Sequence, residues 1–150
     1  FPVEAALDVA EELVGPQIEA RKISYAYLGG DKSVKVYADR DRCQQIVLNL
    51  LSNALKFTPD GGRIAVGWRV VGEQVLIDVA DTGIGVATDQ LQRIFDPFVQ
   101  VQSGNTRTSE GIGLGLAISR DMARQMGGEV SVKSELGKGS TFTLSLPRDP

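Results

Sequence analysis

Residues 39–62 read DRDRCQQIVLNLLSNALKFTPDGG, an amphipathic helix that ends abruptly. Asp39 is a favoured helix N-cap residue, so the helix is expected to extend from there to Phe57. The run Thr58-Pro59-Asp60-Gly61-Gly62 then stops it, because proline and glycine break regular structure most strongly. Apolar side chains recur at helical spacing and form the stripe expected to face the core: Cys43, Ile46, Val47, Leu50 and Ala54.

Alternating apolar and polar residues on either side of this helix predict strands. The expected strands are 23–28, 34–38, 64–70, 75–81, 130–134 and 141–146, with hairpins across Gly72-Glu73-Gln74 and Gly137-Lys138-Gly139. Further helices are expected at 2–20, with Pro2 in the first helical position and a candidate kink at Gly15-Pro16, and also at 89–94 and 112–126. A long polar loop is expected over 95–111.

The alternation of the strands indicates a sheet with one covered face and one solvated face. We therefore expect an α/β (α+β) two-layer sandwich in which a mixed, mostly antiparallel sheet is covered on one face by about three helices. The length of 150 residues predicts a single domain over 1–150.

The composition excludes several kinds of chemistry. The chain has 42% hydrophobic and 23% charged residues, a net charge of −3, one cysteine and no histidine. The missing histidine rules out Ser-His-Asp and Cys-His catalysis and His-ligated zinc. The acidic balance argues against a nucleic-acid surface, and no apolar run approaches the ~20 residues that span a bilayer. The start at Phe1 lacks an initiator Met and a signal peptide, so a fragment of a longer chain is expected.

A second, polar stripe follows the apolar one on the helix 39–57. It consists of Arg42, Gln45, Asn49, Ser52, Asn53 and Lys56. A solvated face is one interpretation, but such faces favour Glu, Lys and Arg over mid-helix Asn and Ser. Two Asn residues four apart, with Lys56 three further on, present amide oxygens and a cation in a row. This arrangement suits a hydrated Mg²⁺ beside phosphates.

Asp81 ends the expected strand 75–81 on the same face as its apolar residues, so its carboxylate points toward the core. One interpretation is a cap for the following Thr82-Gly83-Ile84-Gly85 turn. The other is an acceptor for a ligand amino group such as that of adenine, with Gly83 and Gly85 allowing close backbone approach.

Gly111-Ile112-Gly113-Leu114-Gly115-Leu116 leads into a helix. Its spacing is neither the GxGxxG of dinucleotide folds nor a P-loop. Amides at a helix N-terminus still bind phosphate, although glycines that allow tight helix packing remain an alternative. In the polar loop before it, Phe95 and Phe98 are expected to anchor the root, and Arg107 to reach a phosphate.

Five segments in this order resemble the boxes of sensor histidine kinases. Residues 49–57 resemble the N box, Asp81 to Gly85 the first glycine box, and Phe95 to Phe98 the F box. Residues 111–116 are similar to the second glycine box, and 137–142 to the closing glycine segment. The chain thus resembles the catalytic, ATP-binding domain of a bacterial two-component sensor kinase, in the superfamily of gyrase, heat-shock chaperone and MutL ATPases.

The resemblance implies a role for each matching residue. Asn53 would ligate Mg²⁺, with Asn49 supporting the ion and Lys56 and Arg107 contacting phosphate. Phe57 would lie against adenine, and Asp81 would accept from its amino group. The remaining residues implied to bind ATP or to shape its pocket and flexible lid are Gly83, Gly85, Phe95, Phe98, Gly111, Gly113, Leu114, Gly115, Leu116 and Thr141.

The implied reaction transfers the γ-phosphoryl group of MgATP to a histidine on a separate dimerisation domain, upstream of Phe1, and a response regulator receives it afterwards. The isolated chain is expected to bind MgATP without autophosphorylation. The resemblance implies a cytoplasmic domain, either free or tethered to the inner membrane through upstream segments. The domain itself would contact neither nucleic acid nor the membrane. The alternatives are a degenerate, non-catalytic nucleotide-binding module, or an ATPase or serine kinase of the superfamily. The latter two carry a carboxylate general base where this chain has Asn49.

Overall fold

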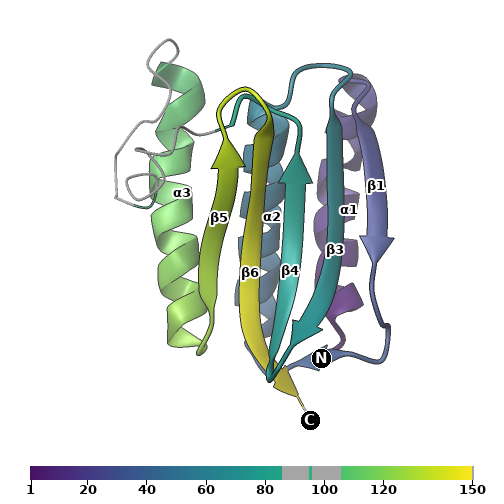
Figure 1. Ribbon diagram of the computed structural model, residues 1–150, viewed down its shortest axis with the longest axis vertical. Coiled ribbons are helices and arrows are strands. Elements are labelled where there is room, and N and C mark those ends of the chain that lie inside the picture. Colours follow the sequence, from purple (N-terminus) through teal and green to yellow (C-terminus); the bar gives the residue numbers. More distant parts are fainter. Residues whose placement is uncertain (86–94, 96–105, 150) are drawn as a thin grey trace.

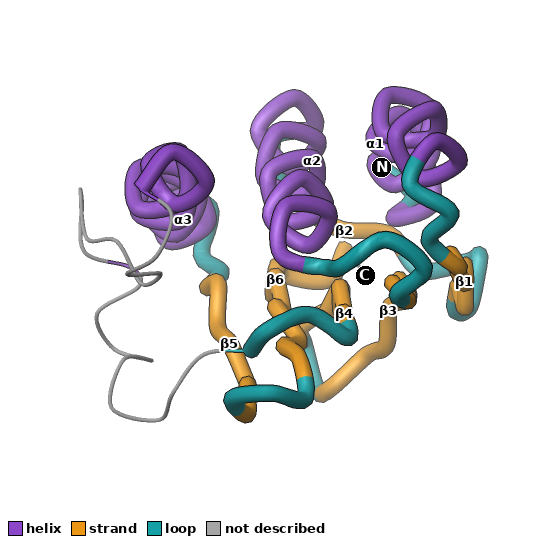
Figure 2. Tube along the Cα trace, turned by 90° about the horizontal axis from the view of Figure 1, so that it is seen from above, coloured by secondary structure: helices purple, strands orange, loops and turns teal. Residues whose placement is uncertain are grey.

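The computed structural model describes the backbone of residues 1–85, Phe95 and residues 106–149, with the side chains of 106–114 excepted. Three helices lie on one face of a sheet: α1 (Val3–Ala20), α2 (Arg40–Phe57) and α3 (Thr106–Gln125). Figure 1 shows the strands in front of these helices, and Figure 2, seen from above, shows the helices side by side in a separate layer. The expected two-layer sandwich is confirmed.

The sheet has six strands: β1 (Ser24–Gly29), β2 (Lys35–Val36), β3 (Arg63–Val71), β4 (Gln74–Asp81), β5 (Glu129–Glu135) and β6 (Gly139–Asp149). The order is β1-β3-β4-β6-β2, and β5 pairs with β6 as well. Only the β1–β3 pair is parallel among the described strands. Both expected hairpins, β3–β4 and β5–β6, form, so the sheet is mixed and mostly antiparallel as predicted.

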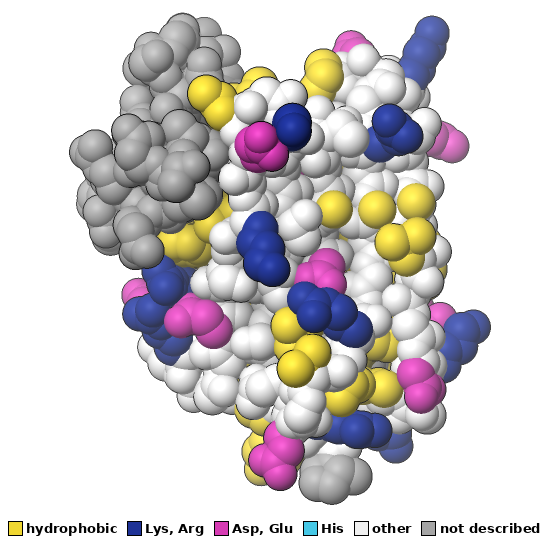
Figure 3. Space-filling view, viewed as in Figure 1, with side chains coloured by type: hydrophobic (Ala, Val, Ile, Leu, Met, Phe, Trp, Pro, Cys, Tyr) yellow, Lys and Arg dark blue, Asp and Glu magenta, His cyan; other side chains and the backbone are white. Residues whose placement is uncertain are grey.

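The two faces of the sheet differ as the alternation predicts. The face under the helices carries the buried residues Ile64, Val66, Trp68, Val75, Ile77, Val79, Phe142, Leu144 and Leu146. The other face, seen in Figure 3, carries scattered positive, negative and hydrophobic side chains. There Asp78 accepts from Arg69 Nε at 2.9 Å and from Thr143 Oγ1 at 2.6 Å. Burial of one face only is what keeps the register of these strands fixed.

The helix α2 agrees with its expected bounds. Asp39 caps it, because its Oδ1 accepts from the Arg42 backbone N–H at 3.0 Å. Pro2 is the N-cap of α1 in extended conformation, one residue outside the helix rather than in its first position. The helix α1 continues through Pro16, whose missing N–H would have bonded Glu12. Both residues are exposed, so water can bond the carbonyl of Glu12.

The helix α3 begins at Thr106, six residues before the expected start at Ile112. The sequence predicts a loop over 106–111, because this stretch is polar and its threonines, serine and glycine have low helix propensity. Once nucleated, however, a helix propagates at low cost per residue, and Arg107 and Glu110 are good helix formers. The expected helix over 89–94 and most of the loop lie outside the described residues. Within the described part of the chain, no helix is long and apolar enough to cross a membrane.

Candidate nucleotide-binding site

The polar flank of α2 faces α3 across a groove of about 260 Å³, whose lining includes Ser52 and Gly115. Asn49 lies in this groove and donates from Nδ2 to Ser119 Oγ on α3 at 2.7 Å. A Cβ atom added to Gly115 would lie 2.7 Å from Asn49 Oδ1, so α3 approaches this amide closely. The polar stripe of α2 predicted from helical spacing therefore contacts α3 in part and is not only a solvated face.

Asn53, one helical turn further along α2, is 4% exposed. Among the described residues, no atom accepts a hydrogen bond from its buried Nδ2. An unpartnered buried amide is costly, so such a group calls for a specific explanation. Because the oxygen and nitrogen of an asparagine amide exchange places by rotation, Asn53 can turn an oxygen toward a cation. Lys56, in the last turn of α2, is exposed and free to reach a ligand.

Asp81, the last residue of β4, lies on the core face, because its cross-strand partner Ile64 is buried. Its Oδ1 accepts from the Gly83 backbone N–H at 2.8 Å, so the turn cap expected as one interpretation is present. Burial raises the pKa of the Asp81 carboxyl above its ordinary value, and the N–H groups of Gly83 and Ser140 oppose this shift. Half-buried carboxylates of this kind are characteristic of functional sites.

The turn after Asp81 is held between two other segments. On one side, the Phe57 carbonyl at the end of α2 accepts from Ile84 N at 3.3 Å, and a Cβ on Gly83 would lie 2.4 Å from this carbonyl oxygen. On the other side, Gly137 N donates to Ile84 O at 2.7 Å. Gly85 has φ +73°, and a Cβ there would lie 2.1 Å from Glu135 O. Both glycines are therefore required by close backbone contacts.

The structure brings Ser140, not Thr141, next to Asp81. Ser140 is the cross-strand partner of Asp81 and is 8% exposed, and its hydroxyl lies 2.8 Å from Ser134 Oγ. Thr141 pairs with Ala80 and therefore lies on the opposite, solvated face of the sheet. Sequence reasoning missed Ser140, although strict alternation from the apolar Phe142 already assigns position 140 to the core face.

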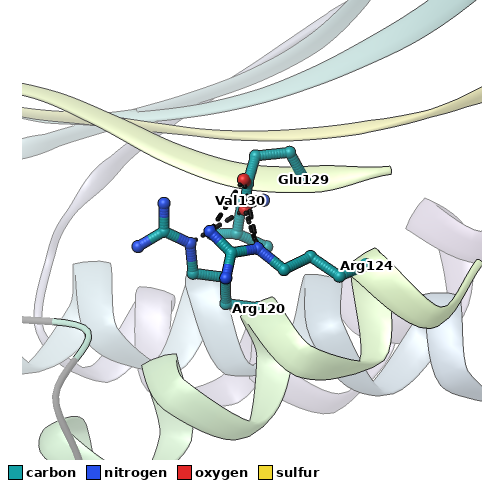
Figure 4. A network of polar contacts seen from close by, with 4 residues as sticks. All are labelled: Arg120, Arg124, Glu129 and Val130. Atoms are coloured by element: carbon teal, nitrogen blue, oxygen red, sulfur yellow. Dashed lines mark hydrogen bonds and ion pairs between the residues drawn. The ribbon is translucent and has the colours of Figure 1, made fainter. Parts of the chain in front are cut away.

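Two arginines in the C-terminal half of α3 form ion pairs with the sheet (Figure 4). Arg120 Nε donates to Glu129 Oε1 of β5 at 2.9 Å, and Arg124 Nη2 to its Oε2 at 3.1 Å. Arg120 also lies over the ring of Phe95, 4.4 Å from its centroid. Phe95 packs against the core, as expected for an anchor. Leu116, on the same helix, is fully buried.

The remaining candidates are described in part or not at all. Gly111, Gly113 and Leu114 lie inside α3 and not at its N-terminus, so the expectation that their N–H groups are free to bind phosphate is wrong: those groups bond within the helix. Arg107 also belongs to the backbone of α3. The side chains of 106–114 and all of Phe98 lie outside the described residues. The structure thus brings together Phe57, Asp81, Gly83 and Gly85 at one end of the sheet. It also brings Asn49 and Gly115 into contact where α2 packs against α3, which is one helical turn from Asn53; this contact between the two helices is called the α2–α3 seam.

The segments that form this site also match a known family in sequence. Residues 38–150 match the family of histidine kinase-, DNA gyrase B-, and HSP90-like ATPases. This chain belongs to that family. The match includes every segment of the site just described, so the expected membership of this ATPase superfamily is confirmed.

Two of its sequence relatives are histidine kinases. The chain is 36% identical over 149 residues to a sensor-like histidine kinase of Rhizobium meliloti, with 99% of the chain and 28% of that protein covered. It is 46% identical over 123 residues to the sensor histidine kinase RcsC of Salmonella typhimurium, with 82% of the chain and 13% of RcsC covered. The chain therefore spans less than a third of the length of either relative.

Solved structures of histidine kinases have the same fold. The catalytic domain of ThkA superposes with a TM-score of 0.85 at 24% identity, covering 98% of this chain and 93% of that one. Full-length ShkA, solved in complex with AMPPNP, superposes with a TM-score of 0.83 at 37% identity, covering 99% of this chain and 31% of ShkA. The domain is thus an ATPase domain of the histidine kinase type.

Proposed function

We propose that this domain binds MgATP and transfers its γ-phosphoryl group to a histidine on a separate dimerisation domain, as the catalytic part of a two-component sensor kinase. The observation that carries the proposal is the amide of Asn53, which is 4% exposed and leaves Nδ2 without a partner among the described residues. A polar group buried in this way is stabilised by a ligand that restores its missing interaction.

The residues present fit Mg²⁺ with its phosphates. Mg²⁺ takes few protein oxygens and keeps several waters, so a single amide oxygen from Asn53 suffices when phosphates supply the rest. When bound, the ion neutralises charge on the β- and γ-phosphates. Asn49 supports the ion from the preceding turn of α2, and exposed Lys56 adds a positive charge to the phosphates.

Base recognition rests on Asp81. Its carboxylate lies on the core face at the end of β4, where an adenine amino group can donate to it. Guanine carries an acceptor oxygen at the matching place and would oppose the carboxylate. Phe57, half-buried and packed on the core beside this turn, supplies an apolar surface for the ring. The ShkA relative, whose structure contains AMPPNP, supports an adenine nucleotide as the ligand.

In the transfer step, the bond between the γ-phosphorus and its bridging oxygen breaks, and that oxygen leaves with the electron pair as part of ADP. A bond forms between the phosphorus and a ring nitrogen of the acceptor histidine. The chain contains no histidine, so the acceptor belongs to another domain. Asn49 cannot accept a proton from water, and this favours transfer over hydrolysis. Lys56 and Arg107 align and neutralise the phosphates.

The partners and location follow from this reaction. The first partner is the dimerisation domain that carries the acceptor histidine, and the second is the receiver domain of a response regulator. ThkA has been solved in complex with the response regulator TrrA, which supports a partner of that class. ATP is a cytoplasmic substrate, so the proposal implies a cytoplasmic domain. Neither nucleic acid nor direct membrane contact enters it.

The binding part of the proposal is tested by thermal unfolding with MgATP and MgGTP. A ligand that binds only the native state raises the melting temperature, so MgATP is expected to stabilise the protein and MgGTP is not. Asn53→Ala and Asp81→Asn should abolish the shift. Asp78→Asn is the matched control, since Asp78 lies on the same strand but on the solvated face. Equal shifts with both nucleotides, or none with either, would overturn the assignment of an ATP site.

The transfer part is tested with a cognate dimerisation domain supplied in trans and ATP labelled in its γ-phosphoryl group. Label is expected on the histidine of that domain and not on the isolated chain. Binding without transfer to a competent acceptor supports a regulatory module instead. Vigorous steady-state hydrolysis by the chain alone contradicts the kinase.

A further inference from the structure

Arg21, the residue that follows α1, reaches across to the end of α2. Its Nη1 donates to the carbonyl of Leu55 and its Nη2 to the carbonyl of Thr58. Its Nε donates to Asp60 Oδ1 at 2.9 Å, in the turn between α2 and β3. The side chain is 31% exposed, so most of it is held inside this contact.

These three contacts meet a specific need of α2. The last carbonyls of a helix have no partner within the helix, and a cation placed there is also stabilised by the helix dipole. Lys56 is the basic residue in the last turn, but it is exposed on the polar flank. The planar guanidinium of Arg21 bonds two carbonyls and a carboxylate at once, which a lysine ammonium cannot do with the same geometry.

The end of α2 held by Arg21 is also the end that contacts the turn after Asp81. Phe57 lies between the two residues whose carbonyls Arg21 bonds, and its own carbonyl accepts from Ile84 N at 3.3 Å. Gly83, whose N–H donates to Asp81 Oδ1, lies directly against this carbonyl. A continuous set of contacts therefore connects Arg21 with the carboxylate of Asp81.

The backbone around Arg21 reinforces this connection. Gly61 N donates to Arg21 O at 3.1 Å, so the turn between α2 and β3 is tied to Arg21 through both side chain and main chain. Gly62 O in turn accepts from Ser24 N at 2.8 Å, at the start of β1. Arg21 thus lies where α1, β1, α2 and the turn 58–62 meet.

We propose that Arg21 is a positioning residue for base recognition: by holding the end of α2, it fixes the Phe57 carbonyl against Gly83 and Ile84 and so orients the Asp81 carboxylate toward adenine. This inference rests on the proposed function. Arg21 itself does not touch the nucleotide. Its loss should weaken the part of the affinity that depends on the adenine amino group and leave the part that depends on phosphate and metal unchanged.

The first test needs no nucleotide. Amide hydrogen exchange is measured by NMR on the intact chain for wild type, Arg21→Gln and Arg21→Lys. The Ile84 amide should exchange faster in both variants, and more so with Gln, while the amide of Ile77 in the core of β4 keeps its protection relative to global unfolding. Arg69→Gln is the matched control, because Arg69 also pairs with an aspartate through Nε at 2.9 Å, on the opposite face of the sheet. Unchanged exchange at Ile84 in both Arg21 variants would overturn the proposed coupling.

The second test compares the dissociation constants of ATP and inosine triphosphate, in which a carbonyl replaces the amino group. In Arg21→Gln, the preference for ATP should fall by about three- to tenfold, the worth of one hydrogen bond, with affinity for inosine triphosphate unchanged. Arg21→Lys, which keeps the charge, tests the same point if the Gln variant does not fold, and Arg69→Gln should match wild type. Equal weakening of both nucleotides would indicate a merely structural role and overturn the inference. A wild-type protein that binds neither nucleotide would instead overturn the proposed function.

Discussion

The side-chain amide of Asn49 on α2 donates to the hydroxyl of Ser119 on α3, with 2.7 Å between Nδ2 and Oγ. This bond joins two residues 70 positions apart and connects the helix that carries Asn53 to the helix that carries the glycine-rich segment. Because Gly115 lies against the same amide, the seam between α2 and α3 is both polar and tightly packed.

Ser119→Ala tests the contribution of this bond. Ser119 is 1% exposed, so its removal leaves the Asn49 amide facing an apolar methyl group. We expect the free energy of unfolding to fall by about 1–3 kcal/mol, measured by urea denaturation. Ser131→Ala on the exposed side of β5 should change it by less than about 0.5 kcal/mol. Equal effects of the two substitutions would show that the Asn49 contact contributes nothing.

Gly83→Ala and Gly15→Ala are expected to change the free energy of unfolding in opposite directions. A methyl group at Gly83 would lie 2.4 Å from the Phe57 carbonyl oxygen, so this substitution should destabilise the fold by about 1–3 kcal/mol. At Gly15, inside α1, the added Cβ meets no described atom within 4 Å. Alanine there should stabilise the protein by up to about 1 kcal/mol through helix propensity. Thermal unfolding of the two variants measures both, and a stable Gly83→Ala protein would contradict the close contact.

Cys43 should be inert to thiol reagents in the native protein. It is fully buried in the core, and burial raises the pKa of its thiol to about 12. The thiolate is the reactive form, so labelling with a maleimide or a disulfide reagent near neutral pH should be slow. Labelling should become fast in denaturant and follow the unfolding transition. Rapid stoichiometric labelling under native conditions would place Cys43 outside the core.

Glu129 makes stability depend on pH in the acid range. Burial alone would raise the pKa of Glu129, but hydrogen bonds from Arg120 and Arg124 outweigh it and lower the pKa below its ordinary value of 4.5. A carboxylate whose pKa is lower in the folded state stabilises the protein above its unfolded pKa, and this contribution is lost as the pH falls through the folded pKa. Glu129→Gln should therefore destabilise at pH 7 by up to about 1 kcal/mol, because the pair is partly exposed.

Urea titrations at several pH values measure this effect. The difference in free energy of unfolding between wild type and Glu129→Gln should narrow once the pH falls below about 4.5, the pKa of the carboxyl in the unfolded chain. Glu135→Gln is the matched control. Its pair with Lys138, at 3.4 Å, is exposed on both sides and is expected to contribute little. If the difference in free energy of unfolding between wild type and Glu129→Gln stayed constant across this pH range, the ionised carboxylate of Glu129 would not be the source of the stabilisation.

Local patterns sufficed for much of the fold and part of the site. The bounds of α2, its cap at Asp39 and the two hairpins all follow from interactions between residues close in sequence. The same patterns place the start of α3 six residues too late, because the stretch 106–111 is polar and contains two threonines, a serine and a glycine, which have low helix propensity. At β6 it is Ser140, and not Thr141, that lies on the face of Asp81, as strict alternation from Phe142 already indicates.

The family, the two-layer sandwich and the placement of Asn49, Asn53 and Asp81 on their elements could be predicted from the order of the amino acids. The physical reason is that helical and strand periodicity and the order of the boxes are local properties of the chain. The contact of Asn49 with Ser119 and the cap that Arg21 forms on the end of α2, 37 positions away at Thr58, arise only in the folded protein. No pattern within a helix or strand encodes such contacts, because they exist only after the packing of the core has brought the helices together.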